Sequence, residues 1–149
     1  MRYRAAVPLS DAQKATWLSS VPLFAGISDD SMSRLVAVAG EQEFASGSFI
    51  VRQGQVGTGL YVIVDGVVNI VRGADEVIAT LKTGEFFGEL SVIDQQPRNA
   101  SAQAVESTTV LAVASWDLLA LLEKDPALSL NLIRGLVTRV RAAGDQHRH

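Results

Sequence analysis

Residues 84–101 read GEFFGELSVIDQQPRNAS, and this stretch decides how the chain is interpreted. Gly88 permits another group to approach the backbone closely. Glu89 offers two acceptor oxygens, and Arg98 offers a fork of N–H donors. Residues 90–93 can form one short helical turn, and a helix start beside an arginine favours phosphate binding. A carboxylate next to that anion needs a hydroxyl from which to accept, and a sugar on the same ligand would supply one.

The stretch resembles the phosphate-binding cassette of the cyclic nucleotide-binding domain family, which includes catabolite activators, kinase regulatory subunits and gated channels. The family pattern is Phe-Gly-Glu-Leu, a short loop, then Arg, a small residue, Ala, and Ser or Thr. It matches residues 87–90 and 98–101. Asn99 departs from the usual Ser, Thr or Ala, although Asn can still donate a hydrogen bond. The resemblance extends from Trp17 to the C-terminus, because glycine-marked strands precede the cassette and two helices follow it.

The resemblance implies a site for a cyclic nucleotide, with cyclic AMP as the first expectation and cyclic GMP as the alternative. It implies that Arg98 pairs with the cyclic phosphate and that Glu89 accepts from the ribose 2′-hydroxyl. The other implied ligand contacts are Gly88, Leu90, Asn99 and Ala100 in the cassette and Ile70 and Ile78 against the base. Arg139 completes the implied site, because it matches a last-helix Arg that in some family members reaches the cassette Glu. No catalytic residue, metal or enzymatic activity is implied.

The pattern from residue 42 to residue 114 indicates antiparallel strands, because the hydrophobic period is two and glycines separate short apolar runs. Asp65-Gly66 between two such runs predicts a type I′ hairpin, and residues 73–75 predict a second turn. We expect an α+β fold, an antiparallel β-roll (a double-stranded β-helix, jelly-roll-like) flanked by N-terminal helices and a C-terminal helix pair. The expected single domain, 1–149, divides into an N-terminal arm and helices (1–41), the roll with its cassette (42–114, cassette 84–101) and C-terminal helices (115–149).

Helix starts are marked by capping residues on both sides of the roll. Ser10 with Gln13 fits a capping box, Ser28 fits an N-cap, and Asp125 followed by Pro126 predicts the start of the last helix. The last helix has two apolar faces, one formed by Leu130, Ile133, Val137 and Val140 and the other by Leu128, Leu132 and Leu136. One face suffices for docking on the roll, so the second predicts a homodimer seam or a lid over the ligand. One wide buried face is the alternative. We expect a dimer to use Leu132, Ile133 or Leu136.

Composition excludes several functional classes. The net charge of −3 does not favour nucleic-acid binding, and the absence of cysteine excludes disulfide and zinc-ribbon frameworks. No apolar run is long enough to span a bilayer and no signal peptide is visible, so we expect a cytoplasmic protein with no membrane or nucleic-acid partner. The chain ends after the last helix without room for a helix-turn-helix, so we expect either a free-standing sensor or the sensory piece of a longer protein.

Two alternative functions belong to other classes. A cupin-like enzyme would need histidines in the roll, whereas the two histidines are His147 and His149. A degenerate roll could serve as a dimerisation module without binding a nucleotide, although the complete pair of Glu89 and Arg98 argues against this.

Overall fold

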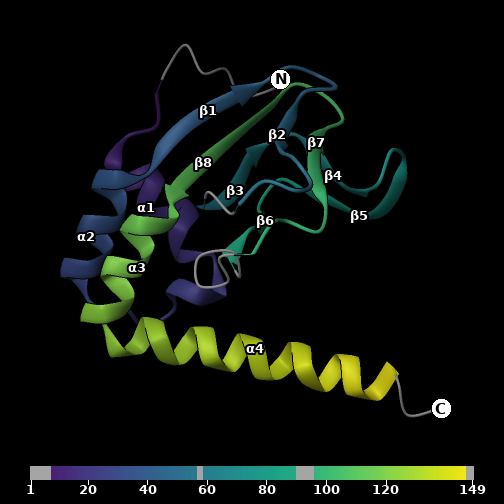
Figure 1. Cartoon of the computed structure of the whole chain (residues 1–149). Coiled ribbons are helices and arrows are strands. Elements are labelled where there is room, and N and C mark those ends of the chain that lie inside the picture. Colours follow the sequence, from purple (N-terminus) through teal and green to yellow (C-terminus); the bar gives the residue numbers. More distant parts are fainter. Residues whose placement is uncertain (1–7, 57–58, 90–95, 147–149) are drawn as a thin grey trace.

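The computed structural model describes residues 8–56, 59–89 and 96–146, which form a β-roll with the shorter helices gathered at one end and the long last helix running alongside it (Figure 1). The elements are, in chain order, α1 (Asp11–Ser19), η1 (Pro22–Phe24), α2 (Asp29–Val38), β1 (Gly40–Phe44), β2 (Phe49–Val51), β3 (Gly59–Asp65), β4 (Val67–Arg72), β5 (Glu76–Lys82), β6 (Phe86–Phe87), β7 (Ser101–Ala104), β8 (Thr108–Ala114), α3 (Ser115–Lys124) and α4 (Pro126–Gln146). The expected class, a β-roll flanked by helices, is confirmed. Its first strand begins at Gly40, slightly before the expected start of the roll.

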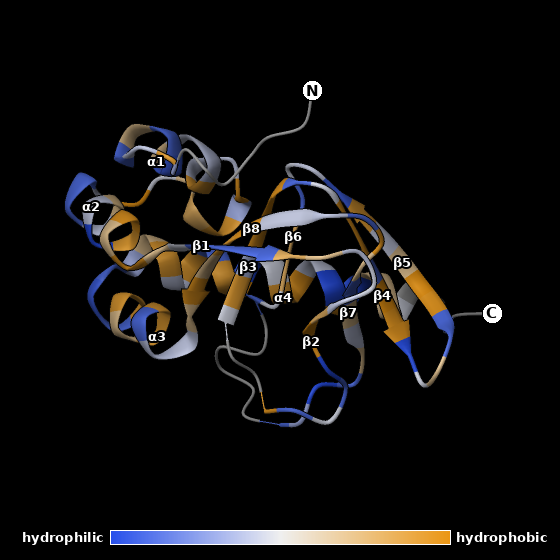
Figure 2. Ribbon diagram, turned by 90° about the horizontal axis from the view of Figure 1, so that it is seen from above, coloured by the Kyte–Doolittle hydropathy of each residue, from blue (hydrophilic) through white to orange (hydrophobic). Residues whose placement is uncertain are grey.

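The described strands form two four-stranded antiparallel sheets, in the orders β1-β8-β3-β6 and β2-β7-β4-β5. Hydrophobic residues of β3 point alternately to two clusters, as the two-residue period of a strand dictates. Val62 and Val64 pack with the helices, while Tyr61 and Ile63 pack between the two sheets. In Figure 2, β1 at a sheet edge is mostly hydrophilic, whereas β4 and β5 are mostly hydrophobic. Both faces of β3 are therefore buried, one against the helices and the other between the two sheets.

The expected helix starts are confirmed by their hydrogen bonds. Ser10 and Gln13 form a reciprocal capping box on α1, and the Ser28 hydroxyl accepts from the Ser31 amide at the start of α2. The Asp125 carboxylate accepts from the Ala127 amide at the start of α4. These caps satisfy amides that have no partner inside their own helix.

The predicted hairpin at Asp65-Gly66 is wrong. β3 pairs with β6 and β8, whereas β4 pairs with β5 and β7, so residues 65–66 connect the two sheets. Gly66 has a φ of +128°, and a Cβ there would lie 2.3 Å from the Thr108 hydroxyl oxygen. The glycine is required by this close crossing. The second predicted turn does join a paired hairpin, β4 to β5.

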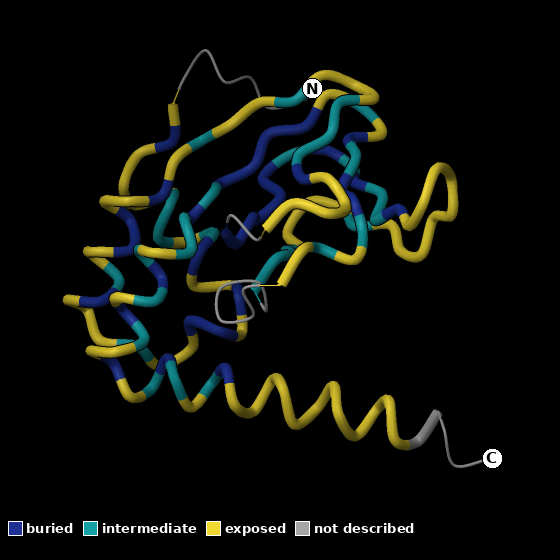
Figure 3. The backbone as a smooth tube through the Cα atoms, in the orientation of Figure 1, coloured by how far each residue is buried: buried dark blue, intermediate teal, exposed yellow. Residues whose placement is uncertain are grey.

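The two apolar faces of α4 have different environments. Leu128 and Leu132 are buried against the body of the molecule, and the Asn131 amide donates to the carbonyls of Leu23 and Ala25 in and beside η1. The other face is exposed: Leu130, Ile133, Val137 and Val140. Figure 3 shows the consequence, a helix partly buried in its first turns and exposed toward its C-terminal end. Leu132 is therefore not available to a dimer partner, contrary to expectation, because its own chain covers it. No helix in the described ranges is long and apolar enough to cross a membrane.

Candidate functional site

A cavity of about 540 Å³ opens between the cassette, the inner side of the β2-β7-β4-β5 sheet and α4. This volume is within the range of small-molecule sites. Its described lining residues are Val51, Ile70, Phe86, Phe87, Gly88, Glu89, Gln96, Pro97, Arg98, Asn99, Ala100, Ser101, Ala102 and Arg139. Residues from both ends of the cassette and from the last helix therefore meet at one place.

The first half of the cassette is fixed by β6. Phe87 pairs in register with Tyr61 of β3, and their rings stack with centroids 5.2 Å apart. This pairing delivers Gly88 and Glu89 to the cavity directly after the strand. Gly88 has a φ of +94°, which strongly favours glycine. A Cβ at Gly88 would lie 2.3 Å from the Gly59 carbonyl oxygen, so space as well as conformation excludes a side chain.

The second half of the cassette is fixed through Arg98. Its amide donates to the Gln55 carbonyl at 2.6 Å, and its carbonyl accepts from the Gly54 amide at 2.8 Å. Its Nη2 donates to the Gly59 carbonyl at 3.2 Å. Burial lowers the pKa of the Arg98 guanidinium, and the charge interaction with Tyr61 partly opposes this effect. An arginine still keeps its charge in a protein, so the cavity holds a partly desolvated cation.

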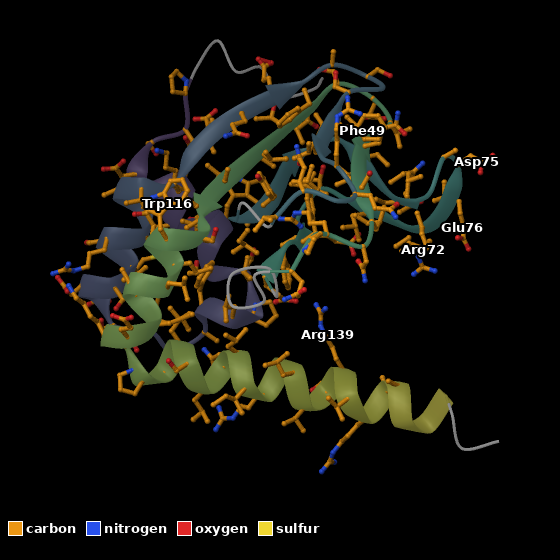
Figure 4. All side chains as sticks on the ribbon, viewed as in Figure 1. Phe49, Arg72, Asp75, Glu76, Trp116 and Arg139 are labelled. Atoms are coloured by element: carbon orange, nitrogen blue, oxygen red, sulfur yellow. The ribbon has the colours of Figure 1, made fainter. Side chains whose placement is uncertain are left out.

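Glu89 pairs with Arg139, which α4 places across the cavity. The Glu89 side chain is 16% exposed and that of Arg139 is 55% exposed, so the carboxylate belongs to the wall and the guanidinium reaches it from solvent. In Figure 4, Arg139 points from α4 toward the roll. Among the described residues, the ion pair between Arg139 and Glu89 joins the exposed half of α4 to the cassette.

The charges of the cavity suit an anion that also carries hydroxyl groups. Two guanidinium groups and one carboxylate are present among the described lining residues, giving a net charge of +1. A cyclic phosphate diester carries one negative charge, which Arg98 can bind through two parallel hydrogen bonds. Ile70 and the phenylalanine side chains of β6 supply apolar surface for a planar ring.

The cavity includes most of the residues expected from the sequence. Gly88, Glu89, Arg98, Asn99, Ala100, Ile70 and Arg139 all line it. Ile78 does not: it is the extra residue of a bulge between the β4 and β5 pairings, and 42% of it is exposed. Leu90 and the short helical turn expected at residues 90–93 lie outside the described residues.

Two site features were missed from the sequence. Gly59 has no local signal, because its contact with Arg98 depends on the register of β3 with β8. Phe87 belongs to the family motif, and the anchoring role of its strand has one sequence signal, the apolar pair Phe86-Phe87 directly before Gly88. Among the described residues, no cluster of three or more His, Cys, Asp or Glu side chains could hold a metal ion.

Comparison with known proteins identifies the same region. Residues 41–125, more than half of the chain, match the family model described as "Cyclic nucleotide-binding domain". The chain is 36% identical over 126 residues to the cyclic AMP receptor protein of Thermus thermophilus, covering 82% of this chain and 58% of that protein. It is 32% identical over 100 residues to the cAMP-dependent protein kinase regulatory subunit of Schizosaccharomyces pombe, covering 67% of this chain and 24% of that protein.

A solved structure extends the comparison at the level of the fold. The sensor domain of the transcriptional regulator DNR from Pseudomonas aeruginosa superimposes with a TM-score of 0.82 at 24% identity, over 93% of this chain and 96% of that one. The chain thus spans only part of the curated relatives but nearly all of that isolated sensor domain. With the family model covering the roll, the cassette and α3, the chain belongs to the cyclic nucleotide-binding domain family.

Proposed function

We propose that this chain is a cytoplasmic sensor that binds cyclic AMP reversibly in the cavity and reports binding through α4. The observation that carries the proposal is the convergence of Arg98 and Glu89 on one cavity, with Glu89 also in contact with Arg139 of α4. A ligand that engages Glu89 must therefore change the environment of the helix. This is a differential contact, which a ligand needs in order to shift a conformational equilibrium.

Each part of the ligand has a matching group in this proposal. Arg98 binds the phosphate, and the backbone around Gly88, Leu90, Asn99 and Ala100 adds donors. Glu89 accepts from the ribose 2′-hydroxyl. Ile70 contacts the base from the roll, while Arg139 closes the site from the helix. Ile78 would reach the base only if β5 moved, because it does not line the cavity. These roles need no nucleophile or metal, so the function is binding and not catalysis.

Cyclic AMP is the first candidate because the two curated relatives described above carry cyclic AMP in their names. Cyclic GMP is the alternative, because the resemblance implies last-helix hydroxyl residues that contact adenine in the activator branch, and this chain has Ala143 and Gly144 at those positions. Isothermal titration with cyclic AMP, cyclic GMP and 5′-AMP tests the function. We expect saturable binding of cyclic AMP at one site per chain, with weaker binding of 5′-AMP, whose phosphate monoester lacks the ring. Absence of binding by both cyclic nucleotides would contradict the proposal.

We also propose that the functional unit is a homodimer formed through α4. Leu130, Ile133, Val137 and Val140 alternate in steps of three and four residues, the repeat that forms a two-helix seam. Ile133 and Val140 are 55% and 70% exposed, so their side chains are open to a second helix. Leu136, at 38% exposed, lies beside this stripe. A second copy would bury this apolar surface symmetrically.

A further inference from the structure

The carbonyl oxygen of Gly59 contacts two residues of the candidate site. Arg98 donates to it through Nη2 at 3.2 Å, and the same oxygen lies 2.3 Å from the position that a Cβ of Gly88 would occupy. We propose that Gly59 is a positioning residue that holds the Arg98 guanidinium in place for the phosphate. Gly88 is then glycine because the Gly59 carbonyl fills the space where its side chain would begin. This inference rests on the proposed function and adds a residue to its site.

The position of the Gly59 carbonyl is set by the sheet. Gly59 is the first residue of β3 and pairs with Ala114, the last residue of β8. A Cβ on Gly59 would lie 2.2 Å from the Val113 carbonyl oxygen, so the Gly59 backbone is packed directly against β8. A group held by a paired strand is more precisely placed than one held by a loop. The sheet therefore provides a fixed support for a guanidinium that comes from the cassette.

Arg98 is attached to one segment through both its backbone and its side chain. Its amide and carbonyl bond to Gln55 and Gly54, shortly before β3, and its guanidinium bonds to Gly59 at the start of that strand. A guanidinium has five N–H groups in a rigid fork, so donating one of them to a carbonyl is compatible with two-pronged binding of a phosphate. The contact fixes the direction of the fork before the ligand arrives, which lowers the entropy cost of binding.

This arrangement gives Gly88 a role that differs from direct contact with the ligand. If Gly88 were glycine only to let the phosphate approach the backbone, its replacement would weaken binding independently of Arg98. If it makes room for the Gly59 carbonyl, a Cβ must displace that carbonyl and so misdirect Arg98. The two cases differ in whether the effects of Gly88 and Arg98 are additive.

A double-mutant cycle separates these cases, with the cyclic AMP dissociation constant as the readout. We expect Gly88→Ala alone to weaken binding by about tenfold or more, as for loss of a well-placed charged hydrogen bond. In the Arg98→Ala background the same change should add less than about threefold. Gly47→Ala is the matched control, because Gly47 lies outside the cassette and has a similar φ (+85° against +94°) but nothing within 4 Å of its Cβ position. This control should bind cyclic AMP like the wild type.

A second variant tests the carbonyl without adding an atom. Replacing Leu60 by the corresponding α-hydroxy acid turns the Gly59 carbonyl into an ester carbonyl, which is a weaker acceptor. We expect weaker binding of cyclic AMP in the otherwise wild-type chain and no further loss in the Arg98→Ala background. Additive losses in both cycles, or full binding by Gly88→Ala, would overturn the positioning role while leaving the proposed function intact. A wild-type chain that binds no cyclic nucleotide would overturn the proposed function itself.

Discussion

In the proposed site, Glu89 is the residue that distinguishes a ribose from a 2′-deoxyribose. Its side chain is 16% exposed and already has Arg139 as a partner. A 2′-hydroxyl would add a donor to a carboxylate that the wall of the cavity largely screens from water. A site built to hydrogen-bond a hydroxyl discriminates against ligands that lack it, because the protein group loses a partner that water cannot replace.

The first prediction therefore concerns 2′-deoxy cyclic AMP. We expect it to bind the wild type more weakly than cyclic AMP by about 1–3 kcal/mol. Glu89→Gln should narrow this difference, because an amide is less costly to leave without a partner than a carboxylate. Arg139→Gln should widen it, because Glu89 then lacks the alternative cation. Competition titrations measure the ratio of the two dissociation constants in each variant, and equal affinities in the wild type would mean that Glu89 does not read the ribose.

At the scale of residues, the sequence predicted that the two ends of the cassette lie near one another, because they belong to one short stretch of chain. Glu89 and Arg98 are close in sequence, and both line the cavity. The contact of Arg139 with Glu89 spans 50 residues and was expected only from the resemblance. Ile78 was expected to contact the base but does not line the cavity, because a bulge at that point shifts the register. The β5 sequence contains no signal for this bulge.

At the scale of elements, strand existence was predictable but strand partners were not. Asp65-Gly66 correctly indicated that the chain turns, yet turn chemistry does not specify which strands pair. β3 is instead paired with β8, far away in sequence, because their residues share the buried face. The helix caps were predictable because a cap depends on residues within one turn.

We expect the two halves of α4 to respond differently to ligand binding. Its first turns are anchored by buried Leu128 and Leu132, while Arg139 attaches the exposed half. Gly135 lies between them and lowers helix stability by about 1 kcal/mol relative to alanine. We expect saturating cyclic AMP to slow amide exchange across α4, most strongly after Gly135, because the ligand adds contacts to Arg139. Exchange in α1 is the internal control.

Hydrogen exchange followed by mass spectrometry measures this response. Arg139→Gln should lose most of the slowing in the second half of α4, even at cyclic AMP concentrations that saturate the variant. Unchanged exchange across α4 in the wild type at saturating nucleotide would contradict the relay.

Asp125 links α3, which it follows, with α2 and α4 through its carboxylate hydrogen bonds, and we expect this junction to be sensitive to acid. The pKa of its carboxyl is lowered, chiefly by the hydrogen bond from the Ser31 hydroxyl, with further contributions from the backbone amides of Ser28, Ala127 and Leu128. The folded state therefore stabilises the ionised form of the Asp125 carboxyl relative to its protonated form. Its contribution to stability is present above the ordinary carboxyl pKa of about 3.9 and is lost as the pH falls through the lower folded value.

The corresponding variant is Asp125→Asn. We expect it to unfold at a lower temperature than the wild type at pH 7, and the difference should shrink as the pH is lowered from 5 toward 2. Thermal denaturation followed by circular dichroism across this range measures the difference. Asp75→Asn, in the exposed turn between β4 and β5, is the control and should show no such dependence. A difference for Asp125→Asn that is independent of pH would show that the charge of Asp125 does not stabilise this junction.

At the scale of the whole molecule, the exposed stripe of α4 predicts self-association. Val140→Glu places a charge in the proposed seam, where burial without a partner is costly. We expect the wild type to sediment as a dimer at micromolar concentrations and Val140→Glu to sediment as a monomer. Val77→Glu is the matched control, because Val77 is a comparably exposed valine on β5, away from the stripe. A monomeric wild type, or a dimeric Val140→Glu variant, would contradict the seam.

At the scale of the whole molecule, we also expect the fold to bind a cyclic nucleotide by presenting Arg98 to its phosphate. The most direct test of this expectation is calorimetric titration of cyclic AMP into the wild type and the Arg98→Ala variant, with circular dichroism to verify that both are folded. A charge-assisted hydrogen bond in a partly desolvated site contributes about 1.5–3 kcal/mol, so the dissociation constant should rise about tenfold to a hundredfold or more. Equal dissociation constants for the two proteins would contradict the account.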